Sequence, residues 1–537
     1  MKFSSQTIPF SETNQFPKLF LDYISRLEKL IPGNMFLPDD NGYQLATEYF
    51  QYNEKIRKVV TTVIREQYKS TEIPIDENLI SRLEQPGTFT VCTGHQLCLF
   101  TGPLYFIYKI ISTIRLAQEQ SEKLGKKIVP VYWMATEDHD FEEIRSVNLF
   151  GKTLKWSLGN SSGETEAKGP VGRLKTDSLV NILGELKTLL GESDDAKRFF
   201  ATIEKAYRPG RTLAQATREF VHELFQGKVL ILDGDDARLK SFLSPVFKND
   251  LLDHAPEKFV TATASILSSE GYAIQVNPRS INSFFMKGNL RERIEEQDGK
   301  YIVLNSGISF SREEMLDEIK NHPEHFSPNV VLRPLYQQLI LPNIAYVGGP
   351  GEISYWLEYP ALFNNFGITF PILQPRHFAL LLDKNSAERL SKFQISIAEL
   401  FGDVEEVIKS FVKKNAGDSI SLETEKEELK RVFDNLRKKI VSIDPSLDGA
   451  ANAELQKQLN AIENLEAKVM RAAKQKLETS VTQIRKLREK ILPGNVLQER
   501  YENFIPYYLK YGDSFISEMA SGFNFPISGL QVLSEVN

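Results

Sequence analysis

A group of polar residues that could bind an anion lies between a short apolar run, Phe89–Cys92, and the start of an amphipathic helix. Pro103 favours a helix start, because its fixed φ suits the first turn and its missing N–H is not needed there. The free N–H groups and partial positive charge of a helix N-terminus suit phosphate or carboxylate. His95 could donate to a phosphoryl oxygen as charge builds up there. We therefore predict ligand binding by Thr93, Gly94, His95, Gln96, Thr101, Gly102 and Lys109.

The alternative interpretation of this group is a capped helix preceded by a turn with a buried histidine. The P-loop pattern G-x-x-x-x-G-K-[ST] is absent, so a P-loop nucleotide site is excluded. Cys92 and Cys98 are interpreted as small core residues rather than nucleophiles.

A second group is the acidic run Glu137, Asp138, His139 and Asp140, which follows the apolar stretch 128–135. Burying these ionisable groups without partners would be costly. They could hold Mg²⁺, bind an amine or act as a general base. The alternative is a solvated turn that caps a helix. No second histidine stands near His139 at metal-ligand spacing, so no dedicated metal site is predicted.

A third group follows other predicted strands. The glycine-rich turn Gly348, Gly349, Gly351 and Glu352 would let the backbone approach a ligand closely, although a plain strand-to-helix turn is the alternative. Asp233 ends another apolar run, where a helix cap is the competing role. Arg376 follows the run 368–374 and is a further candidate for ligand binding.

The elements that must position these groups form a β-α-β unit. Leu104, Ile107, Ile111 and Ile114 make one apolar stripe on a helix, and residues 128–135 read as a strand covered on both faces. Residues 228–233, 273–276, 345–348 and 368–374 read as further strands. This order predicts an α/β fold with a parallel sheet, in which ligands bind at the carboxyl ends of the strands.

The pattern of apolar and polar residues changes near residue 386. Apolar residues then recur at three- and four-residue steps, and 451–492 contains neither Gly nor Pro, which predicts two long helices in an antiparallel coiled-coil hairpin. The predicted organisation is an N-terminal helical part of the core (1–87), the first β-α-β unit (88–140), an insertion (141–225), core (226–279), a second small insertion (280–328), core (329–385), the coiled-coil domain (386–494) and a helical tail packing on the core (495–537).

Composition limits the classes of function. The 537 residues are 41% hydrophobic and 25% charged with a net charge of −6, which is typical of a globular protein without a strongly basic block. Nucleic acid is therefore not expected as a partner. No apolar run is long enough to span a membrane, and no signal peptide is recognised. With only two cysteines, we expect a cytoplasmic protein.

Several motifs together resemble a known family. They are Thr93-Gly-His-Gln, Phe100-Thr-Gly-Pro-Leu-Tyr, Trp133-Met-Ala-Thr-Glu-Asp-His-Asp, Phe326-Ser-Pro-Asn, Ala345-Tyr-Val-Gly-Gly-Pro-Gly-Glu-Ile and Leu497-Gln-Glu-Arg. Over nearly the whole chain, the sequence resembles the cysteine ligases of bacillithiol biosynthesis, the BshC family. The resemblance implies a Rossmann-like core with inserted connective segments, akin to class I nucleotidylyl transferases and aminoacyl-tRNA synthetases, and a coiled coil that pairs two subunits in a homodimer.

The implied reaction condenses cysteine with the amine of glucosaminyl malate. Forming an amide in water needs an activated carboxyl group, so ATP or another nucleotide is expected, with Mg²⁺ possible alongside it. The synthetases' second histidine and lysine loop are not evident, so their activation chemistry is not carried over. Our hypothesis is that His95 and the Thr101-Gly102 helix start bind phosphate, that Glu137, Asp138 and Asp140 orient or deprotonate the amine, and that Gly348–Glu352 closes the pocket.

Three alternatives compete with the ligase. One is a non-catalytic, nucleotide-binding coiled-coil scaffold, and another is a nucleotidylyl-transferase-like enzyme with a different substrate. The third is a tRNA-related binder, because segment 451–492 carries nine Lys and Arg against five Asp and Glu. Ordinary charge on a helix surface explains that excess.

Overall fold

The computed structural model describes residues 2–26, 30, 35–159, 169–416 and 421–536. It divides into two compact units. The first comprises Gln15–Ala379 and Glu499–Gln531, and the second comprises Lys2–Asn14, Leu380–Gln498 and Val532–Asn537. None of the described helices combines the length and the apolar character needed to cross a bilayer.

The core of the first unit is a five-stranded sheet with the order β13-β12-β2-β3-β6, in which every neighbouring pair is parallel. All seven residues of β3 are buried, as expected for a strand covered on both faces. The predicted α/β class with a parallel sheet is confirmed. The strands are β2 (Phe89–His95), β3 (Ile128–Met134), β6 (Leu230–Asp233), β12 (Asn343–Gly348) and β13 (Ile372–Pro375).

The strand order reverses beside β2. From β2 the chain adds β3 and then β6 on one side, and it later adds β12 and β13 on the other. Helices α2 (Asp40–Tyr49) and α5 (Tyr105–Leu124) contribute to an apolar cluster with residues of β2 and β12. The carboxyl ends of β2 and β12 therefore flank a topological switch point, where open α/β sheets bind ligands.

Two insertions interrupt the sheet. The first carries a hairpin, β4 (Ser146–Leu149) and β5 (Lys152–Lys155), and three helices, α7 (Val180–Leu190), α8 (Asp194–Ala206) and α9 (Leu213–Leu224). The second is an antiparallel sheet with the order β10-β9-β8-β7-β11 and the helix α13 (Arg312–Asn321). Its strands are β7 (Ser283–Lys287), β8 (Leu290–Gln297), β9 (Lys300–Val303), β10 (Ile308–Phe310) and β11 (Phe326–Pro328).

One predicted strand is wrong. Residues 273–276 form no regular strand. The Gln275 backbone N–H donates to Glu358 Oε1 (2.8 Å), so a side chain supplies the hydrogen bond that a neighbouring strand would have supplied. The apolar character of this segment reflects packing, since Tyr272 and Val276 are both buried.

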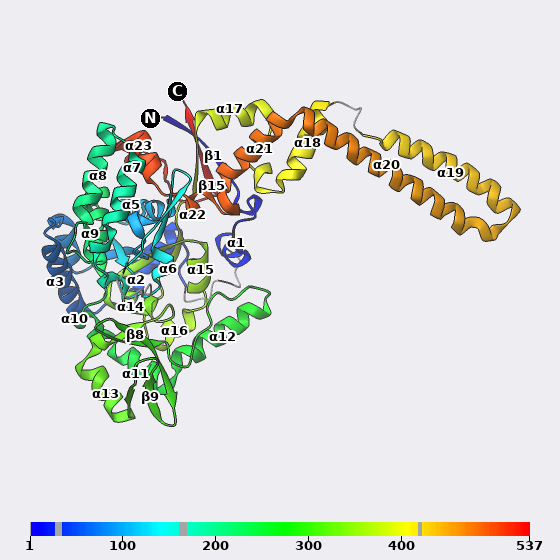
Figure 1. The fold of residues 1–537 in the computed structure, drawn as a ribbon. Coiled ribbons are helices and arrows are strands. Elements are labelled where there is room, and N and C mark those ends of the chain that lie inside the picture. The colour runs from blue at the N-terminus through cyan, green and yellow to red at the C-terminus, as the bar shows by residue number, and fades with distance from the viewer. Residues whose placement is uncertain (1, 27–29, 31–34, 160–168, 417–420, 537) are drawn as a thin grey trace. The chain divides into compact units, whose positions relative to one another are not determined.

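The second unit contains the predicted helical hairpin, which is confirmed. Figure 1 shows α19 (Glu423–Ile443) and α20 (Asp448–Lys476) running side by side, joined by a tight turn at Asp444. Lys426 bridges the two helices by pairing with Glu466 (2.8 Å). The other helices of this unit are α17 (Lys384–Phe393), α18 (Val404–Ala416) and α21 (Glu478–Ile491).

The C-terminal segment begins with helices and ends in a strand. Helices α23 (Ile505–Tyr511) and α24 (Ser514–Gly522) pack on α8 and α5 within the first unit. The chain then ends in β15 (Leu530–Val536), which lies between β1 (Lys2–Ile8) and β14 (Ala379–Leu382) in a three-stranded sheet. The prediction of a wholly helical tail is therefore wrong in its last part.

Candidate active site

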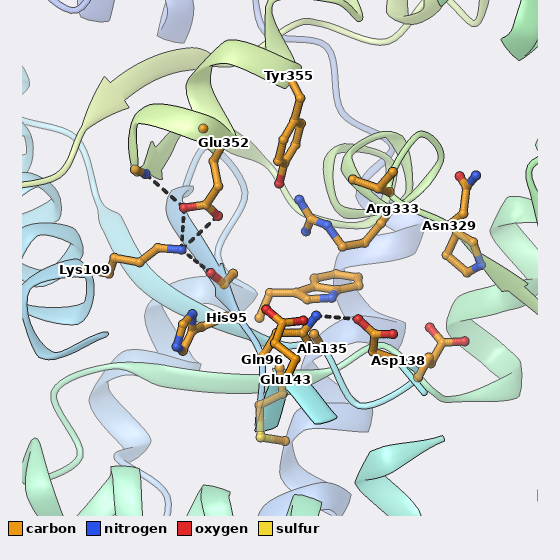
Figure 2. A pocket seen from close by; sticks show the side chains of 18 of the residues that line it. His95, Gln96, Lys109, Ala135, Asp138, Glu143, Asn329, Arg333, Glu352 and Tyr355 are labelled. Atoms are coloured by element: carbon orange, nitrogen blue, oxygen red, sulfur yellow. Dashed lines mark hydrogen bonds and ion pairs between the residues drawn. The ribbon is translucent and has the colours of Figure 1, made fainter. Parts of the chain in front are cut away.

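A cavity of about 610 Å³ opens at the carboxyl ends of β2, β3 and β12, beside the switch point of the sheet. This volume lies in the usual range for small-molecule sites, about 300–1,000 Å³. Polar side chains project into it from opposite sides (Figure 2). Eleven predicted residues line it: Gly94, His95, Gln96, Lys109, Glu137, Asp138, His139, Gly349, Gly351, Glu352 and Arg376.

Lys109 and Glu352 form a buried ion pair at one side of the cavity. Lys109 Nζ lies 2.7 and 2.8 Å from the two carboxylate oxygens and also donates to the Gly94 carbonyl. Glu352 additionally accepts from Tyr346 Oη (2.6 Å) and the Gly349 N–H (2.9 Å). Burial would raise the pKa of Glu352, but Lys109 and these donors outweigh it and lower the pKa to about 2. Together these contacts tie the helix α5 and the end of β2 to the glycine-rich turn after β12.

His95 is neutral at physiological pH. Burial, followed by the nearby charge of Lys109, lowers the pKa of His95 to about 3. Its ring packs against Tyr105 and Phe106, with centroids 5.3 and 5.0 Å away, and its buried Nε2 has no hydrogen-bond partner in the described structure. In a neutral imidazole one ring nitrogen donates a hydrogen bond and the other accepts one, so Nε2 can contact a ligand in either role without His95 carrying charge.

The opposite side of the cavity is acidic. Asp138 accepts hydrogen bonds from Gln96 Nε2 and from the His139 backbone N–H (2.7 Å). Burial would raise the pKa of Asp138, but Arg291 and these donors hold it below its usual value. Glu137 pairs with buried Lys240 (2.7 Å), and burial raises its pKa. Asp138 is therefore the more available carboxylate for an incoming cation or amine.

Arg376 closes another edge of the cavity. Its guanidinium pairs with Glu499 (2.5 Å), and both side chains are fully buried. It also lies over the rings of Tyr105 and Phe378, at 5.1 and 4.2 Å. Arg376 is thus held rigidly, as a residue that positions a ligand must be.

Six predicted residues do not line the cavity. Thr101 and Gly102 belong to a turn that the C-terminal segment covers, because Asn503 Nδ2 donates to the Gly102 carbonyl (2.6 Å) and the Leu104 N–H donates to the Glu502 carbonyl (2.7 Å). The helix α5 begins only at Tyr105, so its first turn is occupied by protein. The expectation that this helix start binds phosphate is not met.

The other four have structural partners. Thr93 Oγ1 donates to the Val347 carbonyl (2.8 Å) and links β2 to β12. Gly348 accepts from the Arg376 N–H (2.9 Å). Asp233 accepts from Thr136 Oγ1 and from the Asp235 N–H. Asp140 is exposed and caps the short helix α6 (Phe141–Ile144) by accepting from the Glu143 N–H (3.1 Å). The capping alternative thus describes Asp140.

Sequence reasoning missed several lining residues. Arg291 lies on β8 of the second insertion, and Arg333 begins α14 (Arg333–Ile340). A detectable signal existed only for Arg333, which follows Asn329 in the Phe326-Ser-Pro-Asn motif. Arg291 stands in an alternating strand with no local sign of function. Further lining residues not predicted include Tyr105, Glu143, Gln275, Phe284, Asn329, Tyr355 and Arg500.

Comparison with known proteins decides the family. Residues 3–377 match the model of the bacillithiol biosynthesis BshC N-terminal Rossmann-like domain, and residues 379–534 match that of the BshC C-terminal coiled-coil domain. The chain belongs to the BshC family. The Rossmann-like core and coiled coil implied by the sequence motifs are therefore confirmed.

Curated relatives match over their full length. A protein of Christiangramia forsetii is 41% identical over 95% of this chain and 96% of its own. One of Flavobacterium psychrophilum is 40% identical over 96% of both chains, and one of Salinibacter ruber is 30% identical over 98% and 97%. All three carry the name "Putative cysteine ligase BshC". The BshC match spans both units, so it covers the cavity and the hairpin alike.

Proposed function

We propose that this protein is a ligase of bacillithiol biosynthesis that joins the carboxyl group of cysteine to the amine of glucosaminyl malate, using a nucleotide to activate the carboxyl group. Membership of the BshC family supports the ligase class. The observation that carries the proposal is the single cavity at the switch point, which gathers neutral His95, cationic side chains and the Asp138 carboxylate around one space. A carboxylate, an amine and a phosphate each find a complementary group there.

The residues fit a nucleotide as the activating group. Three buried nitrogens have no hydrogen-bond partner among the described residues and belong to side chains that line the cavity: His95 Nε2, Arg333 Nη2 and Arg376 Nε. Phosphate oxygens would satisfy the two arginine donors, and also His95 Nε2 in the tautomer that carries its proton there. Gly94 and Gly349 leave room at the strand ends for cationic side chains, because a Cβ at these positions would lie 3.5 Å from Arg333 Nη1 and 3.6 Å from Arg376 Nε. ATP or another nucleotide would supply the chemical activation of the carboxyl group.

The chain's own residues would then have separate tasks. Asp138 would bind the amine and orient it, because its lowered pKa keeps it charged. His95 would donate to an oxyanion through its Nε2, as a neutral imidazole. Lys109, already paired with Glu352, would hold α5, the end of β2 and the glycine-rich turn in position rather than bind substrate.

Mg²⁺ would arrive with the nucleotide. In the described part of the chain, the residues whose ligand atoms gather closely enough for an ion are His322, Glu324 and His325, and they lie outside this cavity. Mg²⁺ commonly binds through phosphates with few protein ligands, so a protein-only site is not required.

The test is a reconstituted reaction with cysteine, glucosaminyl malate and ATP, in which the thiol product and the nucleotide product, AMP or ADP, are both measured. We expect thiol formation that stops when any component is omitted, and other nucleoside triphosphates should be compared with ATP. His95→Ala should slow turnover at least about tenfold, whereas His322→Ala, an exposed histidine outside the cavity, should not. Nucleotide binding without turnover would favour the scaffold alternative, and unchanged turnover in His95→Ala would remove His95 from the mechanism.

We also propose that the helical hairpin pairs two copies of the chain. Its apolar side chains remain exposed on α19 and α20, among them Val432 (54%), Ile443 (84%) and Leu465 (54%). Exposed apolar side chains along a coiled coil are typical of helices that pack against a further helix. Light scattering should give a dimer mass for the wild type and a monomer mass for Val432→Lys/Leu465→Lys, while exposed Glu427→Lys should stay dimeric. A monomeric wild type would refute this pairing.

A further inference from the structure

Arg333 differs from the other buried cations that line the cavity. Lys109 is paired with Glu352, and Arg376 is paired with Glu499. Arg291 has no ion pair within 4 Å among the described residues, but its donors reach Ser327 Oγ (3.0 Å), the Pro328 carbonyl and the His139 ring. Arg333 alone among these lining cations has neither a carboxylate partner in the described structure nor a full set of hydrogen bonds.

The contacts of Arg333 in the described part of the chain leave one nitrogen of its guanidinium, Nη2, without an acceptor, although Tyr355 lies against the same side chain. Nη1 donates to Gln337 Oε1 (3.0 Å), and the group lies over Tyr346 and Trp356, with ring centroids 5.7 and 5.9 Å away. Nη2 is buried and has no hydrogen-bond partner among the described residues. A buried donor without a partner costs free energy, and a buried charge without a counter-ion costs more. A ligand that supplies a negatively charged acceptor would therefore remove both of these costs when it binds.

The backbone holds this side chain in place. The Arg333 N–H donates to the Asn329 carbonyl (2.9 Å), and Asn329 Oδ1 accepts from the Val331 N–H (2.8 Å), which locks the turn that begins α14. Pro334 follows directly in the first turn of the helix. The side chain thus starts from a rigid point, and a donor that does not move pays little ordering entropy when it binds.

The guanidinium of Arg333 lies at the switch point of the sheet. A Cβ placed on Gly94 would lie 3.5 Å from Arg333 Nη1, so the guanidinium stands beside the end of β2 and occupies space that a larger side chain at Gly94 would need. Figure 2 shows the guanidinium lying below Tyr355 and pointing toward the side of the cavity where Lys109 and Glu352 lie. Since Glu352 is already held by Lys109, it does not neutralise Arg333.

We propose that Arg333 is a specificity-determining residue whose guanidinium, through its unpartnered Nη2, binds an oxyanion group of a substrate, either a carboxylate or a phosphate. This inference rests on the proposed function for the identity of the substrates, but not for the presence of the site. A guanidinium presents its N–H groups as a planar fork that matches both oxyanions, whereas an ammonium cannot. Arg333→Lys therefore keeps the charge and removes the fork.

The experiment measures ligand binding by thermal shift and calorimetry, so it does not depend on turnover. Wild type, Arg333→Lys and Arg333→Gln are titrated separately with nucleotide, cysteine, glucosaminyl malate, malate and inorganic phosphate. We expect both variants to bind one class of oxyanion at least about tenfold more weakly than the wild type, as for loss of a charge-assisted hydrogen bond. Weaker nucleotide and phosphate binding would identify a phosphate subsite, and weaker malate, cysteine or glucosaminyl malate binding would identify a carboxylate subsite.

The matched control is Arg218→Gln, because Arg218 is buried, has no ion pair among the described residues and lies outside the cavity. It should lower the melting temperature without changing any of the affinities. The proposal is overturned if every affinity is unchanged in both Arg333 variants, or if no oxyanion stabilises the wild type more than Arg333→Lys. Oxyanion binding that depends on Arg333 without thiol formation would reject the proposed function while leaving this site intact.

Discussion

Removing the positive charge of Lys109 should destabilise the first unit by about 3 kcal/mol. The side chains of Lys109 and Glu352 are only 2% and 24% exposed, and their charged atoms lie 2.7 Å apart. The pKa of Glu352 falls from 4.5 to about 2, roughly 2.5 pKa units at about 1.4 kcal/mol each, so the surroundings favour the carboxylate by about 3–4 kcal/mol. Lys109→Met keeps the length of the side chain but leaves that carboxylate without its counter-ion. Breaking a buried pair in this way typically costs about 3–5 kcal/mol.

Thermal unfolding provides the assay. For a unit of about 400 residues, an unfolding entropy of roughly 2.1 cal/mol/K per residue converts about 3 kcal/mol into a decrease of about 4 °C in melting temperature. Lys123→Met is the matched control on the same helix, because Lys123 pairs with Asp40 at an exposed site, and this change should cost no more than about 1 kcal/mol. The double variant Lys109→Met/Glu352→Gln should lose less than the sum of the two single variants.

The pH dependence follows from the lowered pKa of Glu352. Its stabilising contribution is fully present above pH 4.5 and is lost as pH falls toward about 2. Without Lys109, burial makes Glu352 take up a proton more readily, so the gap between variant and wild type should narrow from pH 7 to pH 4. The reasoning is refuted if Lys109→Met melts within 1 °C of the wild type at pH 7, or if the double variant loses the full sum.

Three further predictions concern single positions. Gly102→Ala should lower the free energy of unfolding by at least about 3 kcal/mol in thermal melts, because a Cβ at this residue (φ +68°) would lie 2.5 Å from Cys98 Cβ. Gly87 has a similar backbone (φ +74°) but no atom within 4 Å of an added Cβ, so Gly87→Ala should cost only about 1 kcal/mol, and equal costs for the two variants would contradict the packing argument. Asp138→Asn should slow thiol formation by about ten- to a hundredfold, whereas Asp140→Asn, which keeps the helix cap, should stay within about twofold; the reverse order would exchange their roles. Burial raises the pKa of Glu358 to about 7, so the protonated side chain stabilises the fold at low pH and this stabilisation is lost as pH rises through 7. Glu358→Gln cannot ionise, so its melting temperature relative to the wild type should be higher at pH 8 than at pH 5. A difference between variant and wild type that does not change with pH would contradict this shift.

Much of the site's location could be predicted because strand ends are local features. The apolar runs before Gly94 and before Glu137 mark β2 and β3, and parallel strands bring their carboxyl ends to one edge of the sheet. The glycines after β12 signalled a third contribution to the same edge. Arg291 could not be found in this way, because the inserted antiparallel sheet brings it to the cavity from a segment without any distinctive pattern.

The predicted phosphate site at the helix start, Thr101 and Gly102, shows what the local sequence could not predict. Free N–H groups at that point would suit an anion, and no nearby residue suggests otherwise. Asn503 covers the turn from about 400 positions along the chain, so the covering group is not visible in the local sequence. Capping by a distant segment depends on the tertiary fold and removes a site that local reasoning favours.

The sequence by itself determined most of the secondary structure, the parallel character of the core sheet and the helical hairpin, because apolar periodicity and turn residues act over short distances. The order of the strands in the sheet, the irregular segment 273–276 and the strand β15 in the tail were decided by the tertiary structure. Only the tertiary structure decided which polar residues face the cavity and which are held by other protein groups. Lys109 and Glu352 are 243 residues apart, and each resembled a ligand-binding group until the fold placed one against the other. Arg333 remained without such a partner, and partnering between distant charges is a property of packing that local patterns do not encode.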